Sequence, residues 1–168
     1  MFIRQCREDD LATLEKHYPS PGRNRYHEGR FQRQRQGMST FLVVWLDEDT
    51  PVGSGEIRWH GCAAPEVRAR YPDCPELNGL AVWPAERRSQ GIGTALIQAM
   101  EERVRVRGCD SVGLGVGDDN ARAAALYGRL GYEDVGLPYL DRYAYVDDAG
   151  VRHDVADPCR FLVKRLIP

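Results

Sequence analysis

The segment from residue 77 to residue 116 constrains the fold most, because it alternates between extended and helical patterns. Residues 77–82 form a short apolar run that predicts a strand, and residues 92–106 have the apolar periodicity of a long amphipathic helix. Residues 111–116 predict a second strand. A strand, a helix and a strand in this order require a crossover between parallel strands. This part of the chain therefore predicts a sheet that is at least partly parallel.

The segments on either side of the crossover add antiparallel strands and further helices. The predicted strands there are residues 1–6, 40–46, 52–60, 139–146 and 160–166, and the predicted helices are residues 11–17, 24–36 and 118–130. Asp9 or Asp10 can cap the first of these helices. The resulting order, β α α β β β α β α β β, predicts an α/β fold. We expect a mixed, partly parallel six- to seven-stranded sheet flanked by helices on both faces, in a single domain spanning residues 1–168.

Two segments carry weaker patterns. Residues 24–36 are dense in arginine, glutamine and histidine, which indicates a solvated surface helix or, alternatively, a flap over a substrate. Residues 61–75 contain three prolines and little periodicity, and predict a long loop. In the helix of residues 92–106, Glu101 and Glu102 are expected to face solvent.

Composition narrows the function classes. The 168 residues are 42% hydrophobic with a net charge of −2, which argues against a general nucleic-acid binder. No apolar run is long enough to span a membrane and the N-terminus does not resemble a signal peptide, so we expect a cytoplasmic protein without a membrane partner. The five cysteines are odd in number, widely spaced and never in a C-x-x-C pair. This pattern indicates reduced thiols and neither a disulfide framework nor a metal site.

The loop between the strand and the helix of the crossover predicts an anion site. Arg87 and Arg88 bring positive charge, and Gly91 and Gly93 allow a ligand to approach the backbone. The following helix has no acidic residue in its first two turns, so its free N–H groups and positive dipole end are left for an external anion. The later helix instead begins with Asp118, Asp119 and Asn120, which cap it themselves.

The common nucleotide motifs do not fit this loop. Gly91 and Gly93 are followed by Leu96 where the dinucleotide motif G-x-G-x-x-G needs a third glycine. The chain also lacks the G-K-[ST] of a P-loop. Taken alone, the loop could equally be a tight turn without a ligand.

Two motifs together resemble the GNAT superfamily of acetyl-CoA-dependent N-acetyltransferases. Residues 88–93 read R-S-Q-G-I-G, which matches the R/Q-x-x-G-x-G/A loop of that superfamily, and residues 80–84 (L-A-V-W-P) resemble its L-x-V-x-P strand end. Residues 120–132 (N-A-R-A-A-A-L-Y-G-R-L-G-Y) are similar to its second signature, N-x-x-A-x-x-L-Y-x-x-x-G-F/Y. The chain is therefore identified as a member of this superfamily, with a GNAT-like acetyltransferase fold.

The resemblance implies how acetyl-CoA binds. Backbone amides of the loop would hold the pyrophosphate, and pantetheine would lie between splayed fourth and fifth strands. The glycines at 113, 115 and 117 fit such a gap, or they mark close packing on the sheet. The cofactor-binding residues expected on this basis are Leu80, Val82, Arg87, Arg88, Ser89, Gln90, Gly91, Ile92, Gly93, Thr94, Asn120 and Tyr127. No metal is expected.

The resemblance also implies the groups that move protons. Tyr127 matches the tyrosine that protonates the leaving thiolate, although a tyrosine there could simply pack on the sheet. Glu76 matches the position of a general base, and its alternative role is a surface carboxylate. Glu56 is a second candidate for the base, and His60 and His27 are further ones. A backbone carbonyl with a chain of water molecules could replace all of them.

The predicted function is acetyl transfer from acetyl-CoA to a primary amine of a small molecule or peptide, by direct attack in a ternary complex. Acidic residues outside the motifs, such as Glu66, Asp73 and Asp141, favour a cationic amine. The alternatives are a non-catalytic coenzyme-A-binding regulatory domain and a nucleic-acid module built on the arginines of residues 24–36. The C-terminal strands could form the edge of a homodimer.

Overall fold

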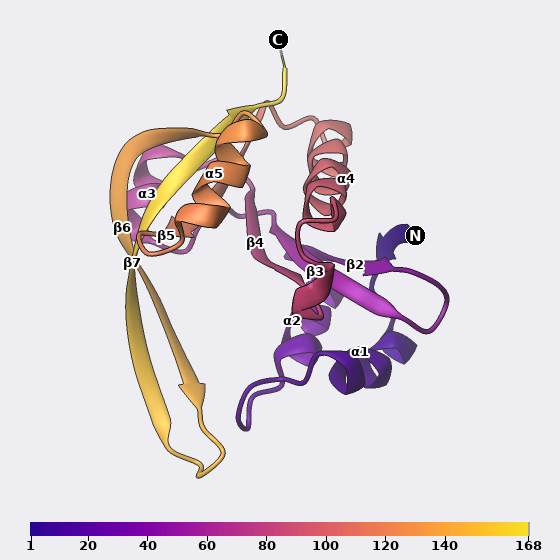
Figure 1. The fold of residues 1–168 in the computed structure, drawn as a ribbon. Helices are drawn as coiled ribbons and strands as arrows, with labels where there is room; N and C mark the ends of the chain where they lie inside the picture. Colours follow the sequence, from indigo (N-terminus) through magenta and orange to yellow (C-terminus); the bar gives the residue numbers. More distant parts are fainter. Residues whose placement is uncertain (168) are drawn as a thin grey trace.

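The computed structural model describes residues 1–167 and contains a seven-stranded mixed sheet (Figure 1). Its strands are β1 (Phe2–Gln5), β2 (Ser39–Trp45), β3 (Pro51–Arg58), β4 (Glu76–Val82), β5 (Ser111–Gly117), β6 (Glu133–Val146) and β7 (Arg152–Arg165). They lie in the order β1-β2-β3-β4-β5-β7-β6, in which β4 and β5 are parallel and the other neighbours antiparallel. The predicted mixed, partly parallel sheet is confirmed.

Helices cover both faces of the sheet, as predicted. The helices are α1 (Leu11–His17), α2 (Tyr26–Arg35), α3 (Pro65–Arg70), α4 (Ile92–Val106) and α5 (Ala121–Arg129), with short 3-10 turns η1 (Glu8–Asp10) and η2 (Ala85–Arg87). Alternate residues of β2 show the two faces, because Leu42 and Val44 pack with α4 while Phe41 and Val43 pack with α1 and α2. Within residues 1–167 no helix is long and apolar enough to cross a membrane.

Strands β4 and β5 diverge soon after they meet, as the resemblance implies. They pair at only two positions, Glu76 with Gly113 and Leu77 with Leu114. On its other side, β4 shifts register against β3 next to Gly79, which has a φ of 59°. An extra residue of this kind bends a strand. The end of β4 therefore faces a gap that is open to a ligand.

The glycines of β5 mark close packing on the opposite side. A Cβ atom added at Gly113 would lie 2.2 Å from the Phe161 ring, and one at Gly115 would lie within bonding distance of the Tyr139 hydroxyl. These aromatic rings occupy the face of β5 away from α4 and α5. The close-packing interpretation of these two glycines is thereby favoured.

The paired strands β6 and β7 form an arm, residues 138–160, that projects from the rest of the sheet (Figure 1). The last strand begins earlier than the predicted Arg160, because its pairing with β6 starts at Arg152. The tip of the arm is held by the loop before α2. Asn24 Oδ1 accepts from the Val146 N–H at 3.0 Å, and Asn24 Nδ2 donates to the Val146 carbonyl at 3.1 Å.

Helix α2 is not the solvated surface helix that its composition indicated. His27, Arg30 and Phe31 are buried, and Arg30 is only 1% exposed. The Arg30 guanidinium donates to the Gly79 carbonyl at 2.8 Å, next to the bulge of β4. Arg33 forms an ion pair with Glu56, so these arginines are engaged inside the protein and give no support to a nucleic-acid surface.

Three further expectations are wrong. Residues 61–75 contain helix α3, which begins at Pro65. Glu101 is buried, because it accepts from the Tyr132 hydroxyl at 2.9 Å and from Lys164 Nζ at 2.8 Å. Asp10 precedes α1 but caps η1 instead, where it accepts from the Arg7 N–H at 2.7 Å.

Candidate functional site

The loop between β4 and α4 has a backbone shaped by two left-handed residues. Ser89 has a φ of 63° and Gly91 a φ of 83°. A left-handed serine is uncommon, and such conformations cluster at ligand sites. Arg88 Nε donates to the Val82 carbonyl at 3.3 Å and Gln90 Nε2 donates to the Glu86 carbonyl at 2.8 Å. These contacts fold the loop back on itself at the end of β4.

The N-terminus of α4 presents free N–H groups to this loop. Gly91 is its N-cap, and no side chain of the described residues accepts from the first turn. The first turn also lacks an acidic residue. Helix α5 differs, because Asn120 Oδ1 accepts from the Ala123 N–H at 3.1 Å and satisfies its first turn. Of these two helices, α4 therefore leaves more unpaired donors for an anion at its positive dipole end.

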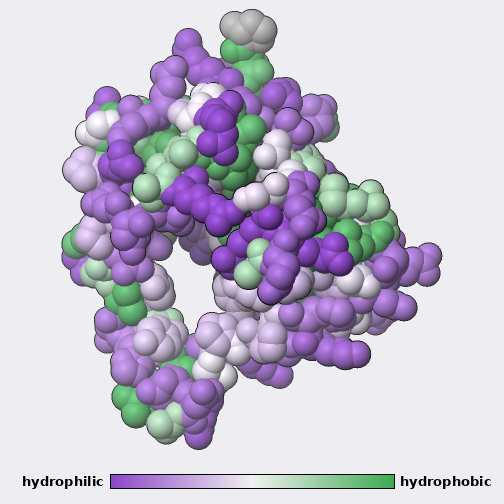
Figure 2. All heavy atoms as spheres, viewed as in Figure 1, coloured by the Kyte–Doolittle hydropathy of each residue, from purple (hydrophilic) through white to green (hydrophobic). Residues whose placement is uncertain are grey.

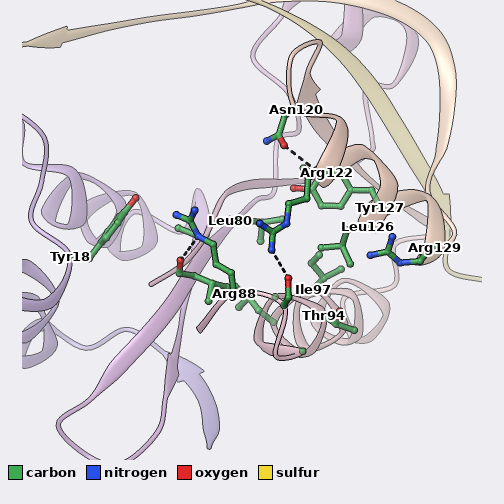
Figure 3. Close-up of a pocket in the computed structure, with 17 residues that line it drawn as sticks. Tyr18, Leu80, Arg88, Thr94, Ile97, Asn120, Arg122, Leu126, Tyr127 and Arg129 are labelled. Atoms are coloured by element: carbon green, nitrogen blue, oxygen red, sulfur yellow. Dashed lines mark hydrogen bonds between the residues drawn. The ribbon is translucent and has the colours of Figure 1, made fainter. Parts of the chain in front are cut away.

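Arg122, in the first turn of α5, connects the two helices. Its guanidinium donates to the Ser89 hydroxyl, which joins α5 to the loop (Figure 3). Sequence analysis did not assign a role to this residue. A signal was present, since Arg122, Leu126 and Arg129 are spaced to share one face of a helix.

A cavity of about 580 Å³ lies between β4, α4 and α5. Its apolar wall includes Leu80, Val82 and Leu126. Its charged side chains are Arg88, Arg122 and Arg129, and none of the described residues lining it is acidic (Figure 3). An elongated ligand with phosphate groups at one end and an uncharged chain at the other fits these residues.

Nine of the twelve predicted cofactor residues line this cavity: Leu80, Val82, Arg88, Ser89, Gly91, Gly93, Thr94, Asn120 and Tyr127. Three do not. Ile92 has its side chain in the hydrophobic core, Gln90 is exposed, and Arg87 is half-buried in η2. Only the backbone of Ile92 remains available to a ligand.

A second cavity, of about 660 Å³, lies between β4, α2 and the arm. Leu80 and Tyr127 line both cavities, so the two spaces meet at these side chains. Figure 2 shows an opening between the arm and the rest of the molecule. Glu76 and Tyr127, the two predicted proton-transfer residues, both line the second cavity.

Glu76 lies at the start of β4 and is only 3% exposed. Its Oε2 atom has no hydrogen-bond partner among the described residues, and Arg58 Nη1 is 3.7 Å away. Burial raises the pKa of Glu76 to about 7; Arg58 opposes this rise and Asp141 adds to it. A carboxylate with a pKa near neutrality can accept a proton from a bound amine.

Tyr127 lies on α5 beside Leu80 (Figure 3). Its ring packs edge-on against Tyr132 at a centroid distance of 6.2 Å. Burial raises the pKa of Tyr127, which keeps the hydroxyl protonated at neutral pH. The residue therefore packs against Tyr132 and carries a protonated hydroxyl at the junction of the cavities.

The other candidates for the base lie outside both cavities. Glu56 is fully buried and accepts from Arg33 through both oxygens, at 2.7 and 2.9 Å. Burial opposes its ionisation, but the bonds and charge of Arg33 outweigh burial and lower the pKa of Glu56. His27 is buried with Nε2 at 2.7 Å from the Tyr18 carbonyl, and His60 is exposed. The structure therefore does not support these three as bases.

Comparisons with known proteins agree with this geometry. A model of the acetyltransferase (GNAT) family matches residues 4–132. The fold is similar to that of the ribosomal-protein-S18-alanine N-acetyltransferase from Escherichia coli, with 18% identity, a TM-score of 0.66 and coverage of 99% of this chain and 94% of that chain.

Two further solved structures have the same fold. The ribosomal-protein-alanine N-acetyltransferase from Brucella melitensis shares 22% identity with a TM-score of 0.65, over 98% of this chain and 99% of that chain. An aminoglycoside 6'-N-acetyltransferase complexed with coenzyme A shares 19% identity with a TM-score of 0.63, over 100% of this chain and 98% of that chain.

Proposed function

Because the chain belongs to the GNAT family of acetyltransferases, we propose that it transfers the acetyl group of acetyl-CoA to a primary amine of a small molecule or peptide. Acetyl-CoA supplies the acyl group. The observation that carries this proposal is the junction of two cavities at Leu80 and Tyr127, because two cosubstrates bound there would place their reacting ends together.

The first cavity would hold the donor. The free N–H groups at the start of α4 and the guanidinium groups of Arg88 and Arg122 would bind the phosphates. The apolar wall formed by Leu80 and Val82 would contact the pantetheine chain. Beyond Leu77, β4 has no paired neighbour on the β5 side, and apart from the Gly79 and Val82 carbonyls, which accept from Arg30 and Arg88, its backbone would face the pantetheine chain.

Glu76 would take the proton that the amine must lose. An alkylammonium has a pKa of about 10.4, so making it nucleophilic at pH 7 costs roughly 4–5 kcal/mol without a base. At pH 7, a carboxylate with its pKa near 7 is present partly in the ionised form, which can accept a proton. Because it is buried, this form is poorly solvated, and its raised affinity for protons favours uptake from a neighbouring ammonium.

Tyr127 would protonate the leaving thiolate. The amine nitrogen forms a bond to the acetyl carbon, the carbon–sulfur bond breaks, and the sulfur receives a proton. The raised pKa of Tyr127 keeps that proton on the hydroxyl until the thiolate forms. The ammonium loses one proton to Glu76 before attack, and the nitrogen loses a second proton when the amide forms. One proton returns through solvent to Tyr127 and Glu76 releases the other to solvent, so both groups are restored before the next turnover.

Direct attack in a ternary complex is supported by the state of the one cysteine in the second cavity. Cys159 is buried, and burial together with Asp141 and Asp157 raises the pKa of its thiol. The thiolate is the nucleophilic form of cysteine, so this residue is poorly suited to an acyl-cysteine step.

Thiol release from acetyl-CoA tests this function across amino acids, polyamines, aminoglycosides, arylamines and peptide N-termini. Calorimetry with coenzyme A is run on the same preparation. Binding of coenzyme A with turnover of at least one amine is expected. Binding without turnover of any amine would instead indicate a non-catalytic coenzyme-A-binding domain, and no binding would refute the proposal.

A further inference from the structure

The two cavities that meet at Leu80 and Tyr127 carry opposite charge. The first is lined by three arginines and, among residues 1–167, by no acid. The second is lined by five acids and by no lysine, arginine or histidine of the described chain; these acids are Glu76, Asp118, Asp119, Asp141 and Asp157. The whole chain has 23 basic and 25 acidic residues, so an overall excess of one sign does not explain the separation.

Arginines outside the cavity lining offset part of this charge, because Arg58 Nη1 lies 3.7 Å from Glu76 Oε2 and Arg160 pairs with Asp118. Asp157 accepts from the Tyr143 hydroxyl at 2.9 Å, and Asp118 lies 3.6 Å from Arg160 Nε. Asp141 forms neither a hydrogen bond nor an ion pair with the described side chains. Like charges held near one another repel, so a cation that enters this space is stabilised.

Glu76 gives an independent indication of a missing partner. Its Oε2 atom is buried and lacks a hydrogen-bond donor in the part of the chain that the structure describes. Buried polar side-chain atoms without a partner are rare in proteins. Arg58 Nη1, at 3.7 Å, supplies a counter-charge but no hydrogen bond, and an ammonium group in the adjoining cavity would supply the donor.

The rest of the lining suits a cationic alkyl chain. Tyr26, Tyr139 and Tyr143 line the cavity, and aromatic faces attract cations while they contact methylene groups. The Tyr26 ring already stacks on the Arg30 guanidinium at 4.3 Å, which leaves Tyr139 and Tyr143 for a ligand. Figure 2 shows an opening between the arm and the body.

We propose that the acceptor is a small polyamine, an alkyl amine with at least one further protonated nitrogen besides the one acetylated. This inference rests on the proposed acetyl transfer. The reacting nitrogen lies between Glu76 and Tyr127, and the additional ammonium group binds Asp141 and Asp157 on the arm. The arm therefore selects the acceptor by charge and takes no part in proton transfer.

Steady-state thiol release with four matched amines tests the selection by charge. The amines are butylamine, 1,4-diaminobutane, spermidine and 6-aminohexanoate. We expect kcat/KM to rise by about 10-fold or more from butylamine to spermidine, and to be lowest for 6-aminohexanoate, whose carboxylate is repelled. Added sodium chloride should raise the KM for spermidine more than the KM for butylamine, which carries a single charge.

The Asp141→Asn variant tests the role of the arm. We expect its KM for spermidine to rise by about 3- to 10-fold, and to rise more than its KM for butylamine, with the KM for acetyl-CoA unchanged. Asp148→Asn is the matched control, because Asp148 lies in the turn of the same arm, outside the cavity lining, and loses the same charge. Equal loss in both variants would indicate a general charge effect and overturn the proposal.

Further outcomes separate this inference from the proposed function. Equal efficiency on butylamine and spermidine, or higher efficiency on a basic peptide, would overturn the polyamine assignment and leave the acetyltransferase intact. Absence of coenzyme A binding would overturn the proposed function. Calorimetry with spermidine alone still tests the cavity in that case, since absence of binding, or equal binding to the Asp141→Asn variant, would refute the inference.

Discussion

Replacement of Glu76 by glutamine is expected to lower activity and raise stability. Glu76 is 3% exposed and its Oε2 atom lacks a hydrogen-bond partner among the described residues. Burial raises its pKa to about 7, from the ordinary 4.5. Glutamine keeps the shape of the side chain but carries no charge. The variant therefore lacks the proposed base, which lowers activity. It also lacks a buried charge, which raises the free energy of unfolding.

The size and sign of the stability change follow from the pKa. The raised pKa of Glu76 contributes stability that is fully present below about pH 4.5, where the carboxyl is protonated in the folded and unfolded chain. That contribution is lost as the pH rises through about 7, and the total loss corresponds to about 3 kcal/mol. Glutamine has no such loss. The variant should therefore match the wild type to within about 1 kcal/mol at pH 5 and exceed it by up to about 3 kcal/mol at pH 8.5.

The attraction between Arg58 and Glu76 reduces the gain in unfolding free energy expected for the variant. The Nη1 atom of Arg58 lies 3.7 Å from Glu76 Oε2, so the variant loses that attraction. The Arg58 side chain is 34% exposed and its Nε atom is also 3.8 Å from Glu56. In the variant, Arg58 therefore keeps solvent and Glu56 as partners. The lost attraction to Glu76 should reduce the gain in unfolding free energy without reversing it.

Urea unfolding at pH 5 and pH 8.5, followed by tryptophan fluorescence, measures the two free energies. Other titrating groups occur in both proteins and cancel in the difference. In the same proteins, kcat/KM for an accepted amine should rise to a plateau through about pH 7 in the wild type. It should fall by about 100-fold or more in Glu76→Gln and lose that inflection. A variant that is less stable than the wild type at pH 8.5, or a difference independent of pH, would refute the reasoning.

Glu56→Gln is the control with the opposite expectation. Glu56 is buried and held by both nitrogens of the Arg33 fork, with Arg30 at 3.8 Å. Removing one partner of a buried ion pair costs about 3–5 kcal/mol, because the arginines lose their counter-charge. This variant should be less stable than the wild type at neutral pH and should keep the inflection near pH 7.

Four further variants test other parts of the structure, the last of them by amide exchange. Tyr127→Phe should lower kcat by about 10- to 100-fold with little change in the calorimetric Kd for coenzyme A, and full activity would remove Tyr127 from proton transfer. Arg122→Ala should weaken coenzyme A binding by about 5- to 10-fold, because a positive charge and the contact with the Ser89 hydroxyl are lost. Unchanged affinity would contradict a role for Arg122 in binding the phosphates. Gly113→Ala should lower the unfolding free energy by about 2 kcal/mol or more, since its Cβ would lie 2.2 Å from the Phe161 ring. Unchanged stability would contradict this close packing. Asn24→Ala should accelerate amide exchange in residues 143–153 but not in α4, because the side-chain bonds to Val146 are lost; equal acceleration in both would show a general destabilisation instead.

The sequence was most informative where the determining interactions are local. Helices α1 and α4 match the predicted ranges residue for residue, because apolar periodicity and flanking residues such as Gly108 define them within a few turns. The loop before α4 was predicted in the same way, since its glycines and arginines are contiguous. Nine of the twelve residues expected to bind the cofactor line one cavity.

Features that depend on distant partners were missed. Glu101 has the pattern of a solvent-facing residue, but its partners Tyr132 and Lys164 lie 31 and 63 residues further along the chain. Arg30 is buried by contacts with β3 and β4 that a window of α2 does not contain. The acids of the second cavity likewise come from β4, β6, β7 and the segment before α5, so no single segment carries their common charge.

The shared wall of the two cavities, Leu80 and Tyr127, has a consequence for inhibitor design. A single molecule that joins coenzyme A to an oligocationic chain could occupy both spaces, because no other lining separates them at this point. Its anionic end would bind the arginines and its cationic end the carboxylates. If the molecule bound in the opposite orientation, its cationic chain would face the arginines and its phosphates would face the carboxylates, and both contacts would be repulsive. Linking the halves also makes binding of the second intramolecular, so affinity should exceed that of either half by orders of magnitude.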